Sequence, residues 1–110
     1  NEAKKPVFTP ASSFPASFRD ISLMAAVDRS SDDVMRDIRE AVKESASDGV
    51  VLEGLRLFDI YAGKGIPEGF RSLAYTLSYR SETRTLTVEE VEAVHNSVRE
   101  SLKRKGYVIR

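Results

Sequence analysis

The chain contains no cysteine, no apolar run near the roughly 18 residues that a membrane-spanning helix needs, and no charged-then-apolar start resembling a secretory signal. The lack of cysteine excludes a disulfide framework. The other two absences argue against membrane insertion and export. Together they predict a soluble protein in a reducing, cytoplasmic setting.

The chain also lacks net charge. Its 17 Lys and Arg side chains balance 17 Asp and Glu side chains, so it has no basic excess of the kind that grips nucleic acid non-specifically. The charge is unevenly placed, because residues 1–55 hold 7 basic and 10 acidic side chains and residues 56–110 hold 10 and 7. A polyanion is therefore expected to prefer the second half.

Proline is scarce except at the start. Pro6, Pro10 and Pro15 lie among Ser, Thr and Ala within residues 1–16, a composition that neither continues a helix nor sits inside a sheet. We expect residues 1–16 to be a linker, which favours an appended module over a complete protein. Residues 17–110, in a chain that is 41% hydrophobic, suffice for one domain with one core.

The first structured segment is typical of a strand followed by a helix. From Phe18 the apolar residues alternate as in a half-buried strand, with one side formed by Ile21, Leu23, Ala25 and Val27 and the other by Asp20, Ser22, Met24 and Ala26. Residues 30–33 supply capping oxygens and first-turn carboxylates. The helix that follows carries Val34, Ile38, Ala41 and Val42 at helical spacing and should end by residues 48–49.

The second half predicts a hairpin, a helix and a last strand. Strands at about 50–62 and 70–81 are joined by a link so short that they must be antiparallel. Thr87 and Glu90 form the capping box of a second helix, whose apolar stripe is Val88, Val91, Val94, Val98 and Leu102. Gly106 fits the left-handed position that ends this helix, and residues 107–109 suffice for a strand.

This order of elements predicts an α+β fold, the ferredoxin-like βαββαβ sandwich. Right-handed crossovers place both helices on one face of a four-stranded antiparallel sheet. The opposite face has no helical cover, so its side chains are the first candidates for binding.

Strand alternation predicts which side chains occupy this open face. In the third strand the large set Leu73, Tyr75, Leu77 and Tyr79 must face the helices, which leaves Ser72, Thr76, Ser78 and Arg80 on the open side. In the second strand, Phe58 and Ile60 are expected under the helices and Leu57, Asp59 and Tyr61 on the open side. A β-bulge between Leu55 and Phe58 would reverse that assignment.

The expected open face offers hydrogen bonds to base edges, one stacking ring and one phosphate contact. A solvated sheet face without a ligand is the other interpretation, since antiparallel sheets often have one. On the pattern alone both interpretations stay open.

The remaining polar features indicate structure more than chemistry. Residues 63–65 join strand to strand without the Gly-Lys-Ser/Thr element of a phosphate loop, so a hairpin turn is expected. His95 has no cysteine, second histidine or carboxylate pair at metal-ligand spacing, which predicts a packed, hydrogen-bonded histidine and no metal site. No serine lies in a nucleophile elbow. The basic residues 103–105 suit a solvated helix end, with phosphate contact as the second choice.

Five segments, taken in their order and spacing, are specific together: Phe14-Pro15, then Phe18-Arg19-Asp20-Ile21-Ser22-Leu23, then Leu57-Phe58-Asp59-Ile60-Tyr61, then Ile66-Pro67-Glu68-Gly69 leading to Ser72-Leu73-Ala74, and finally Arg84-Thr85-Leu86-Thr87 with Glu89-Glu90-Val91. In these segments the chain resembles a known family, the ferredoxin-fold anticodon-binding domain of phenylalanyl-tRNA synthetases. The resemblance covers about residues 14–110.

The resemblance implies a non-catalytic, RNA-binding module that ends the β subunit of an α2β2 phenylalanine-tRNA ligase. It implies docking on the anticodon stem and loop of phenylalanine tRNA, where guanosine at the first anticodon position is an identity element. Aminoacylation with ATP and Mg²⁺ would take place in parts of the enzyme outside this chain, so no cofactor is expected here.

The resemblance also assigns residues. Asp59, Tyr61 and Ser72 match the family's anticodon contacts. Arg19 and Arg84 belong to the matching segments, and they serve either RNA or an internal ion pair with Asp20 or Glu82.

Two other functions stay open at this point. One is a freestanding ferredoxin-like regulatory domain that binds a small ligand or a partner's edge strand, because this fold alone implies no function. The other is a small enzyme of the same fold, which the chain supports least because it has no paired acid and base or activated nucleophile.

Overall fold

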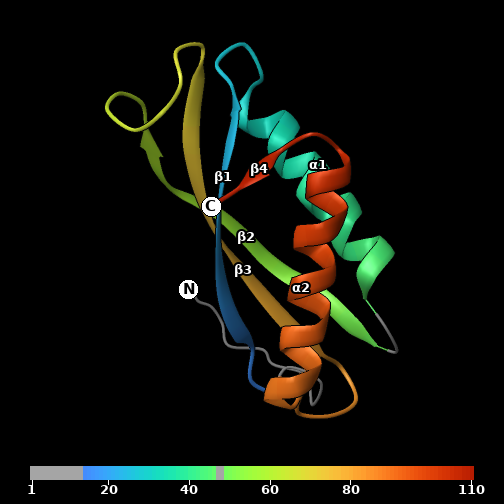
Figure 1. The fold of residues 1–110 in the computed structure, drawn as a ribbon. Coiled ribbons are helices and arrows are strands. Elements are labelled where there is room, and N and C mark those ends of the chain that lie inside the picture. The colour runs from blue at the N-terminus through green and yellow to red at the C-terminus, as the bar shows by residue number, and fades with distance from the viewer. Residues whose placement is uncertain (1–13, 47–48) are drawn as a thin grey trace.

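The computed structural model describes residues 14–46 and 49–110. Within them the elements are β1 (Ser17–Ala26), α1 (Ser31–Ser45), β2 (Val50–Tyr61), β3 (Phe70–Ser81), α2 (Val88–Arg104) and β4 (Val108–Ile109). The strands form one sheet in the order β2-β3-β1-β4, with every neighbouring pair antiparallel. Both helices lie against the same face of the sheet (Figure 1). The predicted ferredoxin-like fold is confirmed, and residues 1–13 of the expected linker lie outside the described residues.

Both helices begin where the capping residues predict, and α2 also ends as predicted. Ser30 Oγ accepts a hydrogen bond from Asp33 N at 3.0 Å at the start of α1. At the start of α2, Thr87 Oγ1 accepts from Glu90 N at 3.1 Å while Glu90 Oε1 accepts from Thr87 N at 3.0 Å, so the capping box is confirmed. Gly106 follows α2 with a φ of 104°, which only glycine adopts without strain.

The core lies between the helices and the sheet. All four residues of the large set on β3, Leu73, Tyr75, Leu77 and Tyr79, are fully buried, and the residues predicted from both helices are buried with one exception. That exception is Val88, which is 65% exposed because it is the first residue of α2. Val27 is 54% exposed because it lies just past the end of β1. The core positions expected for these two valines are wrong.

Strand β2 is irregular, and its irregularity decides which side chains face outward. Its pairing with β3 shifts twice, between Leu52 and Gly54 and between Leu57 and Asp59. Leu57 pairs with Tyr75 and therefore faces the helices, whereas Asp59 pairs with Ala74 and faces the open side. The predictions for Asp59 and Tyr61 are confirmed, and the prediction that Leu57 lies on the open face is wrong.

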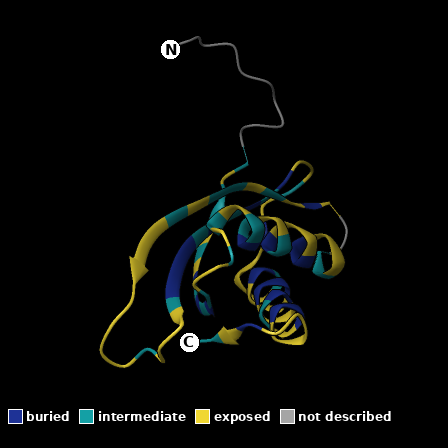
Figure 2. Cartoon of the chain, turned by 90° about the horizontal axis from the view of Figure 1, so that it is seen from above, coloured by how far each residue is buried: buried dark blue, intermediate teal, exposed yellow. Residues whose placement is uncertain are grey.

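Phe58 is the extra residue of the second shift and is 47% exposed. Its expected burial under the helices is therefore wrong. Ile60 pairs with Leu73 on the helical side, as predicted, yet it is 51% exposed. Figure 2 gives the reason, because the end of the β2–β3 hairpin projects beyond the helical layer.

Candidate nucleic-acid interface

The strand register arranges the open face in rows of side chains, because directly paired residues of an antiparallel sheet point to the same side. From the hairpin end downward, the rows are Met24–Ser72–Tyr61, Ser22–Ala74–Asp59, Asp20–Thr76–Arg56 and Phe18–Ser78–Gly54. The first two rows contain all three residues that match the family's anticodon contacts.

These two rows form a shallow hollow of about 490 Å³, lined by Ser22, Asp59, Tyr61, Ser72, Ala74 and Arg110. Its floor consists of small side chains, and Ser72 there is only 7% exposed. Ser72 faces the open side as predicted, but it lies at the bottom of the hollow instead of standing out from the sheet. Asp59 and Tyr61 stand at the rim, where both are exposed.

Tyr61 is held in place by the hairpin that follows it. Its hydroxyl donates a hydrogen bond to the main-chain oxygen of Lys64 at 2.8 Å, and Gly63 reaches the necessary turn with a φ of 135°. The tyrosine remains 44% exposed. The turn expected for residues 63–65 therefore serves the hollow indirectly, by fixing a ring on which a flat ligand can stack.

The other polar residues predicted for the open face lie outside the hollow. Thr76 donates a hydrogen bond to Asp20 Oδ1 at 2.9 Å, and Ser78 lies one row further away. Arg80 forms an ion pair with Glu53, with 2.9 Å between Nε and Oε2. The structure thus brings together Asp59, Tyr61 and Ser72, and it separates them from Thr76, Ser78 and Arg80.

Arg19 and Arg84 both form internal ion pairs, with partners that differ from the two considered above. Arg19 Nε lies 2.6 Å from Glu92 Oε2 on α2, and Arg84 pairs with the capping-box residue Glu90. Arg19 pairs with Leu77 in the sheet and so faces the helical side. Neither arginine lines the hollow.

Three residues of the hollow were not among the site residues predicted from the sequence, namely Ser22, Ala74 and Arg110. Arg110 N donates to Ser22 O at 2.8 Å, which continues the pairing of β4 with β1 and sets Arg110 beside Ser22. Alternation along β1 and β3 already placed Ser22 and Ala74 on the open side. The signal for Arg110 was weak, because a strand of two residues has no periodicity of its own.

Comparison with known proteins gives this geometry a context. Residues 12–110 match the family described as the ferredoxin-fold anticodon binding domain. The chain belongs to this family. It is 46% identical over 104 residues to the phenylalanine-tRNA ligase beta subunit of Symbiobacterium thermophilum, a match that covers 94% of this chain and 11% of that protein. It is 46% identical over 105 residues to the corresponding subunit of Trichormus variabilis, covering 96% of this chain and 12% of that protein. The chain therefore spans about an eighth or less of the curated relatives it matches.

This anticodon-binding domain supports its open face from behind through His95 of α2. The imidazole is 1% exposed. Its Nδ1 lies 2.9 Å from the Tyr79 hydroxyl, and its Nε2 lies 3.0 Å from the main-chain oxygen of Asp20. A neutral ring that donates from Nε2 and accepts at Nδ1 satisfies both contacts. Burial lowers the pKa of His95, which favours that neutral form.

The packed histidine predicted from the sequence is thus confirmed. Burial also raises the pKa of the Tyr79 hydroxyl, so the phenol keeps its proton. Within residues 14–46 and 49–110, no three His, Cys, Asp or Glu side chains come together as a metal site would require.

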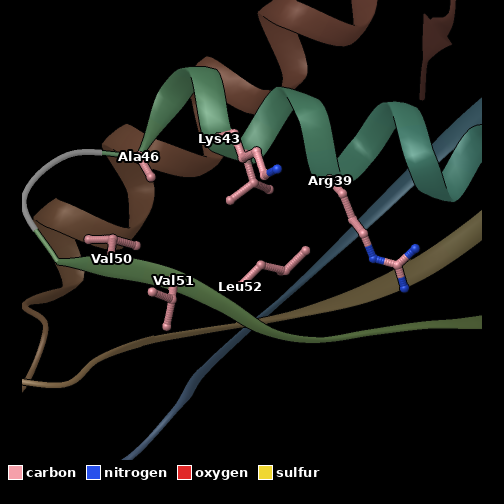
Figure 3. Close-up of a pocket in the computed structure, with 7 residues that line it drawn as sticks. Arg39, Lys43, Ala46, Val50, Val51 and Leu52 are labelled. Atoms are coloured by element: carbon pink, nitrogen blue, oxygen red, sulfur yellow. The ribbon is translucent and has the colours of Figure 1, made fainter.

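A second hollow lies at the opposite end of β2. It has a volume of about 280 Å³ and is lined by Val42, Ala46, Val50, Val51 and Leu52, with Arg39 and Lys43 of α1 at its rim (Figure 3). Its walls are mainly aliphatic and include no aromatic ring. It therefore lacks the stacking platform that the open-face hollow has.

The helical layer carries the remaining charged features. At the end of α2, Lys103 pairs with Glu100 at 3.2 Å, and Lys105 lies 3.7 Å from both Glu40 and Glu44 of α1. In the part of the chain that the structure describes, neither helix has the length and apolar character that crossing a membrane requires.

Proposed function

We propose that this chain is the tRNA-binding module of a phenylalanine-tRNA ligase β subunit and that it docks on the anticodon stem and loop of phenylalanine tRNA. The observation that carries the proposal is the open-face hollow, which gathers Asp59, Tyr61 and Ser72 in a member of an anticodon-binding family. The names of the relatives support the choice of amino acid.

The chemistry of the hollow suits a guanine base. A carboxylate such as Asp59 accepts hydrogen bonds from N1 and N2 of guanine, an arrangement of donors that adenine does not have. The Tyr61 ring gives an unstacked loop base a surface to lie on. The Ser72 hydroxyl can add one contact from the floor. Discrimination between bases therefore rests on Asp59, and stacking rests on Tyr61.

Catalysis belongs to parts of the ligase outside this chain. The described residues offer no phosphate-binding loop and no paired acid and base, so ATP and Mg²⁺ would act elsewhere, and we expect no cofactor in this domain. The purified 110-residue chain is expected to give no phenylalanine-dependent exchange between pyrophosphate and ATP. Exchange above the blank would contradict the assignment of catalysis to other parts of the ligase.

The partners follow from the same proposal. The domain would be joined to the remainder of the β subunit in an α2β2 enzyme of the cytoplasm. Its open face is free for tRNA because both helices lie on the other face of the sheet (Figure 1).

Substitution of Tyr61 in the full-length ligase tests the stacking role. Tyr61→Ala is expected to lower kcat/KM for phenylalanine tRNA by an amount equivalent to about 1–3 kcal/mol, which is the usual value of one base stacked on an aromatic side chain. Tyr61→Phe is the matched control, since it keeps the ring and removes only the bond to Lys64. Phenylalanine activation measured by pyrophosphate exchange should be unchanged in both variants.

Substitution of Asp59 tests base discrimination. Asp59→Ala should narrow the preference for guanosine over adenosine at the first anticodon position, measured with two tRNA transcripts that differ only there. Asp28→Ala, in the exposed turn after β1, is the control and should leave the preference intact. If the Ala variants of Asp59 and Tyr61, together with Ser72→Ala, aminoacylate both transcripts as the parent enzyme does, the proposed function is wrong.

A further inference from the structure

The open-face hollow has a charged side chain, or pole, at each end, Asp59 and Arg110, and the proposed function uses only Asp59. Asp59 lies at one end of the row and Arg110 at the other, with Ala74 and Ser22 between them. Three strand spacings of about 4.8 Å separate the two ends, which gives roughly 14 Å between their Cα atoms. The row therefore spans the whole sheet, from β2 to the end of β4.

Neither pole is neutralised inside the domain. Within residues 14–46 and 49–110, the side chains of Asp59 and Arg110 make no ion pair and no hydrogen bond, and both are exposed. Arg19, Arg29, Arg80 and Arg84 in the same domain all pair with carboxylates. Arg110 is thus a guanidinium at the rim of the hollow with its donors available for a ligand.

The floor of the hollow consists of small side chains. Ser22, Ser72 and Ala74 are among the smallest side chains, and the last two are less than 10% exposed. A planar ring can lie over such a floor, whereas a larger side chain at any of these positions would fill the space. The hollow combines a floor of small side chains, acceptor oxygens at one end and donor nitrogens at the other.

We propose that Arg110 binds the acceptor edge of the same guanine whose donor edge Asp59 binds, an inference that rests on the proposed function. Guanine carries O6 and N7 as acceptors, on an edge that faces away from its N2 amino group. The guanidinium fork matches this acceptor pair with two hydrogen bonds. Adenine presents an amino donor where guanine has O6, so it would oppose Arg110 as well as Asp59. Asp59 and Arg110 would then each discriminate against adenine, independently of one another.

Arg110 could instead hold a phosphate of the RNA backbone, and the two roles give different results. A phosphate contact weakens binding equally for every base, whereas a base-edge contact changes the preference among bases. The position of Arg110 in the same row as Asp59 favours the base edge.

The test uses the full-length ligase and phenylalanine tRNA transcripts that carry guanosine, 7-deazaguanosine, inosine or adenosine at the first anticodon position. The 7-deaza base lacks only the N7 acceptor, and inosine lacks only the N2 amino group. Aminoacylation kcat/KM is measured for the parent enzyme, Arg110→Ala, Arg110→Lys and Asp59→Ala. Arg39→Ala, an exposed arginine of the helical layer, is the matched control.

Arg110→Ala is expected to lower kcat/KM for the guanosine transcript by about 5- to 150-fold, the range for one bidentate contact to a base. It should also abolish the penalty of 7-deazaguanosine while keeping the penalty of inosine. Asp59→Ala should show the reverse pattern. Arg110→Lys keeps the charge without the fork, so it should fall between the parent and the alanine variant. The retained inosine penalty also demonstrates that the variant's hollow is still folded.

Three results would overturn the inference. One is a penalty for 7-deazaguanosine that persists in Arg110→Ala, and another is an equal loss on the guanosine and adenosine transcripts, which would make Arg110 a phosphate contact. The third is an Arg110→Ala enzyme that matches the parent. If the parent enzyme itself does not distinguish guanosine from adenosine, the proposed function fails and this inference fails with it. If the parent distinguishes them and Asp59→Ala does not, Asp59 carries the whole discrimination, so the role given to Arg110 is wrong while the proposed function stands.

Discussion

Among single residues, His95 connects the helical layer to the strand that carries the open face. It reaches the main-chain oxygen of Asp20, whose own side chain lies on the open side beside Thr76. Both ring nitrogens are used, one as a donor and one as an acceptor. A second proton on the ring would turn the acceptor at Nδ1 into a donor that faces the Tyr79 hydroxyl in a buried site, where charge is costly.

This arrangement predicts a pH dependence of stability with a definite sign. Burial lowers the pKa of His95 below its ordinary value of 6.5, so under mildly acid conditions the unfolded chain binds a proton that the folded chain does not. The free energy of unfolding should therefore fall as the pH drops below about 6.5, by at most about 1.4 kcal/mol per pH unit from this group. Above that pH the histidine contributes no slope.

The measurement is urea unfolding of the 110-residue chain at several values between pH 7.5 and pH 5.5. His95→Gln, which cannot titrate, should show a flatter dependence than the parent over this interval. Parallel curves for the two proteins would mean that His95 is protonated with equal ease in the folded and unfolded chain.

Residue-level prediction from the sequence succeeded where the information was local. The place of His95 beside an apolar stripe sufficed to predict that it is packed, and the spacing of Thr87 and Glu90 sufficed for the capping box. The partner of Arg19 could not be found in this way, because Glu92 lies on another element 73 positions away. Arg110 was missed for a related reason, since its neighbours in the hollow come from β1, β2 and β3.

At the scale of elements, the decisive feature is the irregularity of β2. Simple alternation gave the right face to Asp59 and Tyr61 and the wrong face to Leu57, because Phe58 adds one unpaired residue between them. No pattern in the sequence locates such a bulge, since Phe58 is as apolar as the strand residues around it. The existence of strand β2 was predictable from the sequence, but the position of the bulge, where the alternation of its side chains changes, was not.

The bulge predicts an unusual response to deletion. Removing one residue from a strand normally turns every later side chain to the opposite face. Deletion of Phe58 should instead give Leu57, Asp59, Ile60 and Tyr61 a regular alternation and leave Asp59 and Tyr61 on the open face. Deletion of Ile60, in the regular part of the strand, is the matched comparison and should turn Tyr61 inward.

Aminoacylation kinetics of the two full-length deletion variants provide the check. The variant without Phe58 should keep a kcat/KM for phenylalanine tRNA close to that of the parent enzyme, and the variant without Ile60 should lose the contribution of the Tyr61 stack, as Tyr61→Ala does. Equal loss in both would mean that the bulge itself, and not only the faces that it sets, is needed for tRNA recognition.

At the scale of the whole molecule, the balance of charge limits how the domain attracts RNA. Its 17 basic and 17 acidic side chains cancel, and several arginines are occupied by carboxylates. Long-range steering is therefore small. Affinity has to come from a few short-range contacts around one hollow, while the remainder of the ligase holds the tRNA elsewhere.

The isolated chain is accordingly expected to bind an anticodon stem-loop weakly and with strong salt dependence. Each phosphate neutralised should contribute about −0.7 to the slope of log K against log salt for a single-stranded loop, and Lys64, whose main-chain oxygen binds the Tyr61 hydroxyl, is a basic residue close to the hollow. Fluorescence anisotropy of a labelled stem-loop between 50 and about 300 mM salt would measure that slope. Tight binding that does not change with salt would contradict the expectation.

The overhang of the β2–β3 hairpin gives the two sides of the hollow different mechanical properties. Ser22 and Ser72 lie on strands whose opposite face packs Leu23 and Leu73 into the core, so we expect that side to be stiff. Asp59 and Tyr61 lie where the strand pair extends past the helices and neighbours such as Ile60 have solvent behind them, so we expect that side to be more compliant. One side of the hollow is therefore supported by the core, and the other side, which carries Asp59 and Tyr61, is not. A ligand that stacks on Tyr61 would order the hairpin side of the hollow, and the conformational entropy lost in this ordering would weaken binding. Substitutions behind the hairpin could then tune tRNA affinity through stiffness alone, without altering any residue that the RNA touches.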